Sequence, residues 1–300
     1  MTTIAVLGSA NMDLVAYVDR APEKGETITG REFRTVPGGK GANQAIAAAR
    51  AGGDTAMIGA VGSDEHGRLM RTTFEQSGVD TTLLRTVQGP SGTAHIVVDE
   101  EGASAIVVFP GANGLVGGLA AGDENFIAAH DTLLLQLEIP LSGVVAGAEA
   151  ARRHGVRTIL TPSPAQELPP ELYAAVDILV PNHHEATALT GRSDPYAAAR
   201  VLLERVPEVI ITLGRQGSLY ANREAEPFLV PAPQVRAVDS TGAGDTFVGS
   251  LAVALGEGRP MSEALTWAAG AASLSVQKEG ASSSMPFRQE IDAVAAGVAG

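Results

Sequence analysis

Cysteine is absent from this chain of 300 residues, which excludes disulfide bonds and metal sites built on thiolates. Positive charge is also scarce, because 21 Lys and Arg face 34 Asp and Glu and leave a formal net charge of −13. No cluster of Lys and Arg interrupts this acidic excess. The composition therefore argues against a nucleic-acid partner, since binding to a phosphate backbone requires a basic surface.

Long hydrophobic runs are missing as well. No apolar stretch reaches the length of about 20 residues that a transmembrane helix needs. The first one, residues 4–7, is too short for a secretory signal and has no basic residues before it. We therefore expect a cytoplasmic protein with no membrane partner. Aromatic residues make up only 4% of the chain, but hydrophobic residues make up 45%, which is enough for a core and excludes intrinsic disorder.

The order of the segments predicts an α/β fold. Short β-branched runs alternate with Ala-rich segments, a pattern typical of a mostly parallel sheet that helices cover on both faces. Strands are predicted at residues 4–7, 56–61, 132–137, 157–160, 178–180 and 209–213. Helices are predicted at residues 41–50, 142–154, 196–205, 245–255 and 262–276. The chain shows no internal repeat and no long linker, which favours a single domain over residues 1–300.

Two segments depart from this alternation. Residues 14–35 contain alternating stretches, such as 26–30, and no helical period. Residues 93–98 and 103–108 look like two strands joined by a tight turn at 99–102. We expect these pieces to form a small separate sheet, a lid that projects from the core. An extension of the edge of the main sheet is the alternative.

The most informative motif lies at residues 239–245, which read DSTGAGD and precede an apolar helical pattern. Glycine-rich backbone that leads into a helix presents free N–H groups and the positive end of the helix dipole, and both attract phosphate oxygens. Asp245 stands where this helix begins, so it is a candidate for the helix N-cap or for a catalytic base.

A second glycine-rich motif, PGGKGANQ, occupies residues 37–44. Its glycines allow a ligand close to the backbone, while Lys40 and Asn43 offer a charge and an amide to hydroxyl or phosphate groups. It is not a Walker A loop, because Gly41 follows the lysine where Ser or Thr is required. A tight turn that caps a helix is the alternative.

Polar residues follow several predicted strands. Asn11 and Asp13 come after the first strand, and Glu138 follows the strand at 132–137. Ligands of open α/β sheets bind at the carboxyl ends of strands, where such groups can hold adjacent hydroxyls. Asn182 and Glu185 follow the strand at 178–180 and offer oxygen ligands that suit Mg²⁺.

Other classes of site find no support. The run of His183, His184 and Glu185 lacks the His-Glu-x-x-His spacing of a zinc site. No Gly-x-Ser-x-Gly motif marks a serine hydrolase, and no Gly-x-Gly-x-x-Gly follows the first strand as a nicotinamide enzyme requires.

With these motifs the chain resembles the PfkB family of carbohydrate kinases essentially end to end, from residues 8–13 to the region 280–286. The motif at 239–245 matches the family signature in spacing, glycines and final aspartate. The motif at 38–44 is similar to the ribokinase branch of the family in particular. The resemblance implies a ribokinase-like three-layer sandwich with a lid, and transfer of phosphate from ATP to a small sugar. D-ribose, phosphorylated at O5, is the expected acceptor.

The resemblance also assigns roles to individual residues. Asp245 would be the general base, and the N–H groups of Gly242, Ala243 and Gly244 would form an anion hole. The sugar would be held by Asn11, Asp13, Gly39, Lys40, Asn43 and Glu138. The ATP site would be lined by Asn182, Thr212, Gly214, Gly217 and Gly244, with Glu185 organising Mg²⁺ indirectly. A monovalent cation, usually K⁺, would be bound by Asp239, Thr241, Ser275, Lys278, Gly280 and Ser284, several of them through backbone carbonyls.

The resemblance further implies a homodimer in which two lids pair. Three features depart from the family pattern. The segment of residues 192–207 is shorter than the corresponding segment of the family, and Ala268 replaces an expected polar residue near adenine. His95 in the lid is a candidate to alter the polarity of the sugar pocket or the packing of the dimer. Two alternatives stay open. One is another sugar or nucleoside as acceptor, such as 2-deoxyribose, fructose or pseudouridine, and the other is a sugar-binding regulator without catalysis.

Overall fold

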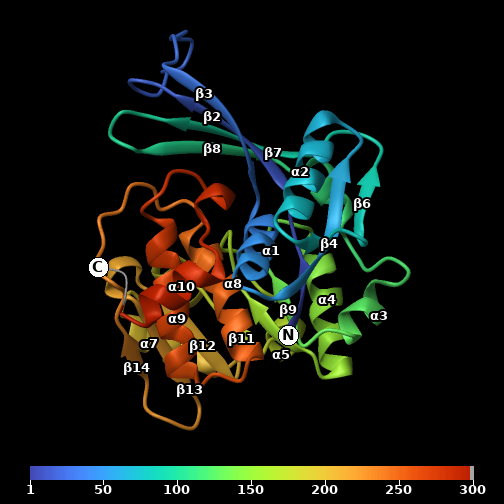
Figure 1. Ribbon diagram of the computed structural model, residues 1–300, viewed down its shortest axis with the longest axis vertical. Coiled ribbons are helices and arrows are strands. Elements are labelled where there is room, and N and C mark those ends of the chain that lie inside the picture. Colours follow the sequence, from blue (N-terminus) through green and yellow to red (C-terminus); the bar gives the residue numbers. More distant parts are fainter. Residues whose placement is uncertain (298–300) are drawn as a thin grey trace.

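The computed structural model, which describes residues 1–297, contains a large central sheet with a small sheet projecting from one end (Figure 1). The central sheet has ten strands in the order β14-β13-β12-β11-β10-β9-β1-β4-β5, with β6 beside β4. All pairs are parallel except β12–β13 and β13–β14. The strands are β1 (Thr3–Leu7), β4 (Asp54–Gly62), β5 (Val79–Asp80), β6 (Leu84–Val87), β9 (Thr132–Leu135), β10 (Arg157–Leu160), β11 (Ile178–Leu179), β12 (Glu208–Thr212), β13 (Ser218–Asn222) and β14 (Phe228–Val230).

Helices cover both faces of this sheet. The described helices are α1 (Lys40–Arg50), α2 (Glu65–Gln76), α3 (Asp123–Ala128), α4 (Leu141–His154), α5 (Pro170–Ala174), α6 (His183–Thr190), α7 (Pro195–Leu203), α8 (Ala243–Gly256), α9 (Met261–Ser275) and α10 (Arg288–Ala295), together with the short 3₁₀ turns η1 (Gly111–Leu115), η2 (Gly214–Gln216) and η3 (Ser282–Ser284). Successive side chains of β1 alternate between two buried clusters: Ile4 packs with α1, α2, α8, α9 and α10, whereas Leu7 packs with α3 to α7. This is the three-layer α/β sandwich that the sequence predicts, with every predicted strand and helix of the core within two residues of its observed bounds.

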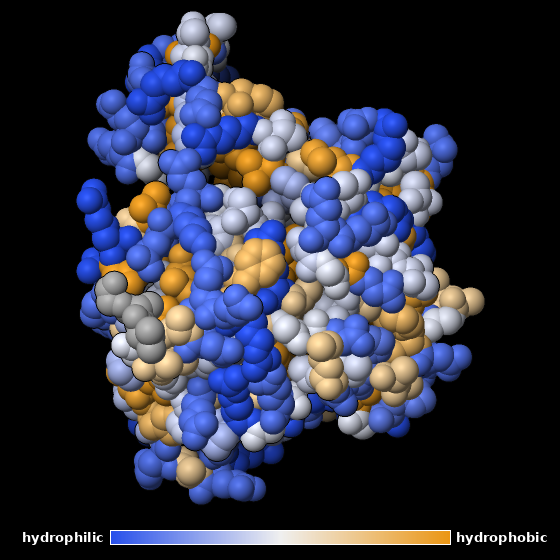
Figure 2. Space-filling model, in the orientation of Figure 1, coloured by the Kyte–Doolittle hydropathy of each residue, from blue (hydrophilic) through white to orange (hydrophobic). Residues whose placement is uncertain are grey.

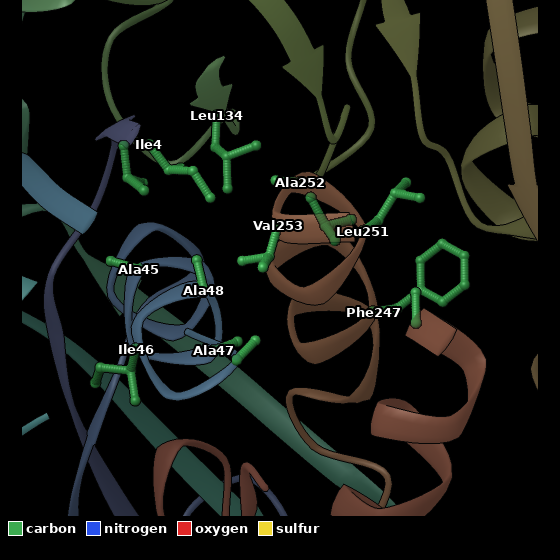
Figure 3. Packing of buried hydrophobic residues seen from close by; sticks show 14 of the residues in the cluster. Ile4, Ala45, Ile46, Ala47, Ala48, Leu134, Phe247, Leu251, Ala252 and Val253 are labelled. Carbon is green, nitrogen blue, oxygen red and sulfur yellow. The ribbon is translucent and has the colours of Figure 1, made fainter. Parts of the chain in front are cut away.

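The two helices that follow the glycine-rich motifs, α1 and α8, pack directly against each other on one face of the sheet (Figure 3). Gly249 permits their close approach: a Cβ atom there would lie 2.7 Å from both the Ala47 Cβ and the Gln44 carbonyl oxygen. Asp245 lies one helical turn before Gly249, and helix residues four apart share a face. The contact therefore brings the start of α8 against the start of α1.

The lid is a separate four-stranded sheet, as predicted. Its order is β3-β2-β7-β8, built from β2 (Asn11–Tyr17), β3 (Glu32–Gly38), β7 (Gly92–Val98) and β8 (Ser104–Phe109). The predicted turn at 99–102 joins β7 to β8, with Gly102 at φ +83° and the Asp99 N–H donating to the Ala103 carbonyl. Figure 2 shows a hollow between this sheet and the body, with hydrophobic surface inside it.

Two details of the predicted lid are wrong. The lid begins at Asn11 rather than residue 14, because Asn11 already pairs with Gly38 and Gly92 in the ladder. Residues 26–30 are not a strand: Glu26 pairs with Arg20 and accepts a hydrogen bond from the Glu23 N–H, which closes a local turn instead of a ladder. Alternation alone does not make a strand when no partner strand lies beside it.

None of the helices in residues 1–297 combines the length and the apolar character needed to cross a membrane.

Candidate active site

The start of α8 is the centre of the site. Gly242 is the N-cap, with a left-handed φ of +74°, and Asp245 is the third residue of the helix. Of the two alternatives for Asp245, the helix N-cap is therefore wrong. The Ala243 N–H donates to the Ser240 carbonyl at 3.2 Å. Within residues 1–297 the N–H groups of Gly242 and Gly244 have no hydrogen-bond acceptor, so they face the site as free donors beside the positive end of the helix dipole.

Asp245 is held by two amides of α1. The Asn43 Nδ2 donates to Asp245 Oδ2 at 3.1 Å, and the Gln44 Nε2 donates to Asp245 Oδ1 at 3.1 Å. Only 6% of Asp245 is exposed, and this burial raises the pKa of its carboxyl above the ordinary value. Lys40 and the two amides act in the opposite direction without cancelling the effect of burial. The result is a desolvated carboxylate whose affinity for a proton is increased, as a general base requires.

The predicted sugar-binding residues surround one side of Asp245. Gly39, at φ +90°, directly precedes α1, and Glu138 accepts from the Lys40 N–H at 2.9 Å and from the Ser9 hydroxyl at 2.6 Å. Asn11 and Asp13 reach the same place as the first and third residues of the lid strand β2, rather than as a loop after β1. The Asn43 Oδ1 is buried and accepts no hydrogen bond from the residues the structure describes, which leaves it open to a hydroxyl donor.

Acidic groups outnumber basic ones here, and this shapes their pKa values. Burial, together with the negative charges of Glu138 and Asp245, raises the pKa of Asp13 to about 7. Burial alone would lower the pKa of Lys40, but the charges of Asp245, Glu138 and Glu185 outweigh it and raise that pKa. Lys40 therefore stays protonated at neutral pH beside these three carboxyl groups.

Three hollows lie beside the start of α8. The lid cleft lies between Asp13 on the lid and Asp239 to Thr241, and the central hollow is lined by Lys40, Glu185, Gly244 and Asp245. The third, the apolar hollow, is lined by Thr212, Gly214, Gly217, Ala232, Pro233, Val235, Gly244, Ala269, Ala272 and Val276. Ser240 lines all three hollows, so two ligands bound in the outer ones would meet at the start of α8.

Asn182 and Glu185 are brought together at the start of α6, where they form a capping box. The Asn182 Oδ1 accepts from the Glu185 N–H at 2.9 Å, and the Glu185 Oε2 accepts from the Asn182 N–H at 2.8 Å. Across residues 1–297 no three His, Cys, Asp or Glu side chains form a cluster that could enclose a metal ion. The Glu185 carboxylate at the central hollow fits Mg²⁺ held through water and ligand phosphates, which is this ion's usual mode.

The predicted K⁺-binding residues lie on two adjacent segments. Asp239 Oδ1 accepts from the Thr241 N–H at 2.9 Å, and Asp239 Oδ2 accepts from the Gly280 N–H at 2.9 Å. Burial would raise the pKa of Asp239, but these hydrogen bonds outweigh it and lower that pKa, so the group stays ionised. The Lys278 N–H donates to the Ser275 carbonyl, whereas the Lys278 side chain pairs with Glu290. Ser284 lies in η3, and its hydroxyl donates to Ala281 rather than to Asp239. The donor set of an ionised carboxylate, hydroxyls and carbonyls fits a hard monovalent cation.

Two of the three departures from the family pattern, at Ala268 and His95, have no bearing on the pockets. Ala268 is fully buried in the core, and its neighbour Ala269 lines the apolar hollow instead. His95 pairs with Leu14, and side chains alternate along a strand, so it lies on the opposite face of the lid from Asp13. There it contacts the Phe109 ring edge-on at 5.2 Å. The hypothesis that His95 alters the polarity of the sugar pocket is therefore wrong.

Sequence reasoning missed several residues that support the site. They are Ser9, Gln44, Asn113, Gln136 and Thr161. Ser9 and Gln44 belong to motifs that the sequence analysis quoted, so their positions carried a signal. Asn113, Gln136 and Thr161 stand outside any motif. Asn113 is 1% exposed, and its Nδ2 donates to Asn11 Oδ1 at 2.7 Å, which fixes the orientation of the Asn11 amide.

A buried carboxylate beside free N–H groups at a helix start, between the lid cleft and the apolar hollow, defines a phosphotransferase site of the sugar kinase class. Comparison with known proteins agrees. Residues 1–288 match the pfkB family of carbohydrate kinases, and the chain belongs to that family.

Its relatives include ribokinases. The chain is 42% identical to the ribokinase of Haemophilus influenzae over 296 residues, covering 96% of each chain. It is also 42% identical to the ribokinase of Bacillus subtilis over 295 residues, which is 97% of this chain and 99% of that one. The solved structure of Arabidopsis thaliana ribokinase complexed with ribose and ATP superposes with a TM-score of 0.93 at 35% identity, covering 98% of this chain and 99% of that one. The predicted fold, family and class of enzyme are confirmed.

Proposed function

We propose that this chain transfers the γ-phosphoryl group of ATP to the O5 hydroxyl of D-ribose and releases ribose 5-phosphate and ADP. The observation that carries the proposal is the position of Asp245. Its buried carboxylate lies beside the free N–H groups of Gly242 and Gly244 in the central hollow, between the lid cleft and the apolar hollow. The 42% identity to two ribokinases supports ribose as the acceptor.

The sugar lies between the lid strand β2 and the start of α1. Asn11, Asp13, Asn43 and Glu138 supply carboxylates and amides, which bind adjacent hydroxyls through charge-assisted hydrogen bonds. Gly39 and Lys40 provide backbone close to the ring and a positive charge. This set suits a small polyol better than a bulky nucleoside, because most of these groups require a hydroxyl partner when the site is closed.

The nucleotide lies in the apolar hollow, with its base against Ala269, Ala272 and Val276 and its phosphates toward Thr212, Gly214, Gly217 and Asn182. The γ-phosphoryl group reaches the start of α8. There the N–H groups of Gly242 and Gly244 receive its oxygens, and the Ala243 N–H joins them by leaving the Ser240 carbonyl. Such preorganised donors stabilise the charge that shifts during transfer.

Asp245 acts as the general base. The proton of the sugar O5 hydroxyl passes to the Asp245 carboxylate as an O5 lone pair forms a bond to the γ-phosphorus. The bond from the γ-phosphorus to the bridging oxygen breaks, and its electron pair leaves with ADP. Proton transfer of this kind contributes about 10²- to 10⁴-fold in rate, and alignment of the two substrates supplies much of the rest.

Two cations complete the proposed site. Mg²⁺, held through water near Glu185, would neutralise charge on the β- and γ-phosphates. K⁺ would lie between the segments of Asp239 and Gly280, bound by Asp239, Thr241, Ser275, Lys278, Gly280 and Ser284. Asp239 already joins these segments to the loop that leads into α8. We therefore expect K⁺ to activate turnover, and equal rates in K⁺ buffer and in buffer free of K⁺ and Na⁺ would contradict this.

The outer face of the lid supports a homodimer. Phe33, Val107 and Phe109 are 64%, 57% and 54% exposed and lie on the face turned away from the lid cleft. An exposed apolar sheet face of this kind is unfavourable in water and marks an interaction surface. We propose that the lids of two protomers pair, so that each lid covers the exposed face of the other. We also propose that residues 1–300 form one domain with this appended lid.

The test of the function is release of ADP from MgATP in K⁺ buffer across D-ribose, 2-deoxyribose, D-fructose, D-xylose, adenosine, pseudouridine and a blank without sugar. Turnover selective for D-ribose supports the proposal. Turnover with another acceptor keeps the reaction and changes the substrate. Binding of ribose without turnover by folded protein would favour a regulator without catalysis.

A further inference from the structure

Gln44 occupies a position beside Asp245 that the proposed mechanism does not yet use. Its side chain is fully buried, and its Nε2 donates to two acceptors, Asp245 Oδ1 and Thr161 Oγ1, each at 3.1 Å. The Gln44 Oε1 accepts from Gln136 Nε2 at 2.7 Å. Both hydrogens of the nitrogen and one lone pair of the oxygen are therefore engaged, as burial of an amide requires.

The direction of these hydrogen bonds is set by Asp245. An ionised carboxylate only accepts hydrogen bonds, so the nitrogen of Gln44 must face it. The oxygen of Gln44 then faces Gln136, whose nitrogen donates to it. A reversed Gln44 amide would oppose its oxygen to the carboxylate and its nitrogen to the nitrogen of Gln136. The three side chains thus form a single chain of hydrogen bonds with one consistent direction.

The two oxygens of Asp245 are consequently not equivalent. Oδ1 is held by Gln44 on the interior side, where Thr161 and Gln136 also lie. Oδ2 is approached by Asn43, whose own Oδ1 is buried and unpartnered among the described residues. Asn43 is one of the residues proposed to hold the sugar, so Oδ2 is the oxygen on the sugar side.

We propose that Gln44 is a positioning residue for phosphoryl transfer: it anchors Asp245 Oδ1, oriented in turn by Gln136, so that Oδ2 is presented to the sugar hydroxyl as the proton acceptor. This role rests on the proposed function. Gln44 contacts neither substrate, and it acts through the geometry and charge of Asp245. A misplacement of a reacting group by about 1 Å can lower a rate by about 10²-fold, so loss of this anchor should slow phosphoryl transfer.

The anchor also affects the proton affinity of Asp245. A donor that binds the charged form of a carboxyl lowers its pKa, so removal of the Gln44 donor raises the pKa of Asp245 further above its ordinary value. The charged groups that face Asp245 are Asp13 on β2, Lys40 on α1, Glu138 after β9 and Glu185 on α6. All four remain in place when Gln44 is changed.

The experiment measures ribose phosphorylation by Gln44→Met, which keeps the length of the side chain and removes its hydrogen bonds. We expect kcat to fall by about 10- to 100-fold, as loss of a charge-assisted hydrogen bond predicts, while KM for ribose stays within about threefold. We also expect the acid limb of the pH–kcat profile to move to higher pH. Gln76→Met, on the exposed end of α2, is the matched control and should change neither quantity.

Two more variants separate positioning from packing. Gln44→Glu keeps the shape of the side chain, and its added negative charge should move the acid limb further than Gln44→Met does. If Gln44→Met does not fold, Gln44→Glu carries the test. Gln136→Leu should lower kcat by less than Gln44→Met, and it should add no further loss in the Gln44→Met background, because it acts through Gln44.

The outcomes distinguish this inference from the function on which it rests. A lowered melting temperature with unchanged kcat and pH profile in both Gln44 variants would make Gln44 a structural residue and overturn the inference alone. An additive loss in the double variant would overturn the part assigned to Gln136. Absence of ribose turnover in the unsubstituted chain would overturn the proposed function, and the role of Gln44 with it.

Discussion

Two regions enclose the proposed sugar site, and they are built in opposite ways. The contact between α1 and α8 is buried (Figure 3). Because Gly249 has no side chain, α8 approaches the Ala47 Cβ and the Gln44 carbonyl of α1 closely. The lid has an outer strand, β8, that is exposed along its whole length. An ion pair between Arg34 and Glu279, 2.6 Å apart, joins the lid to the body beside the lid cleft.

This difference matches the separate roles that we propose for the two regions, phosphoryl transfer at the helix contact and sugar binding at the lid. Phosphoryl transfer depends on fixed positions, and the buried helix contact holds Asp245 where neighbouring packing resists displacement. Sugar binding depends on access, and a sheet with few buried apolar contacts opens at low free energy. Substitutions at the helix contact should therefore lower kcat or stability, whereas substitutions in the lid should raise KM for the sugar.

The largest effect should come from Asp245→Asn. Loss of the general base should lower kcat by about 10³-fold, while the dissociation constant of ribose changes only a few-fold because the shape of the side chain is nearly kept. Steady-state kinetics and calorimetric titration with ribose measure the two quantities. Near-normal turnover would show that Asp245 is not the general base. It would also contradict the expectation that the contact between α1 and α8 controls kcat.

Asp13 provides the corresponding change in the lid. Asp13→Asn should raise KM for ribose by about 10- to 100-fold with a smaller effect on kcat, because it weakens hydrogen bonds between a carboxylate and the sugar. Since the pKa of Asp13 is raised to about 7, its carboxylate is lost as pH falls below about 7. KM of the unsubstituted chain should therefore rise from pH 8 to pH 6.

Asp19→Asn is the control for Asp13, since Asp19 lies in the loop after β2 and its side chain is 75% exposed. It should leave KM and its pH dependence unchanged. A pH dependence of KM that persists in Asp13→Asn would assign the titration to another group.

Gly249→Val and Val107→Ser compare the stability of the two regions. The valine at 249 would force α1 and α8 apart, and we expect the free energy of unfolding to fall by about 1–3 kcal/mol. Val107 is 57% exposed, so Val107→Ser should change that free energy by no more than about 0.5 kcal/mol. Urea titration measures both. A cost for Val107→Ser that grows with protein concentration would indicate a partner over this face of the lid.

The smallest effect should come from Glu279→Gln. The side chains of Arg34 and Glu279 are 37% and 63% exposed, and exposed ion pairs contribute about 0–1 kcal/mol. KM for ribose should therefore change by less than about fivefold, as steady-state kinetics can measure. A change of 100-fold would show that this ion pair controls closure of the lid, and the lid would then be less independent of the body than its exposure indicates.

The sequence by itself determined the layers of the fold and the chemistry of the site. Buried strands such as residues 157–160 and Ala-rich helices such as α1 carry a strong local periodicity, and a glycine-rich turn before a helix has few structural alternatives. For the same reason the motifs at 37–44 and 239–245 could be identified with Lys40, Asn43 and Asp245 as candidate site residues.

Only the tertiary structure decided which groups meet. Asn113, Gln136 and Thr161 lie far from both motifs in the chain. Gln136 and Thr161 directly follow β9 and β10, so their roles depend on the order of strands in the sheet, whereas Asn113 lies in η1 after the lid strand β8. The face of a strand that carries His95 depends on pairing register, which sequence alternation leaves open. The pKa values of Asp13 and Asp245 likewise depend on burial and on charges brought from distant segments. Local patterns set the elements, and long-range packing sets the distances and fields on which catalysis depends.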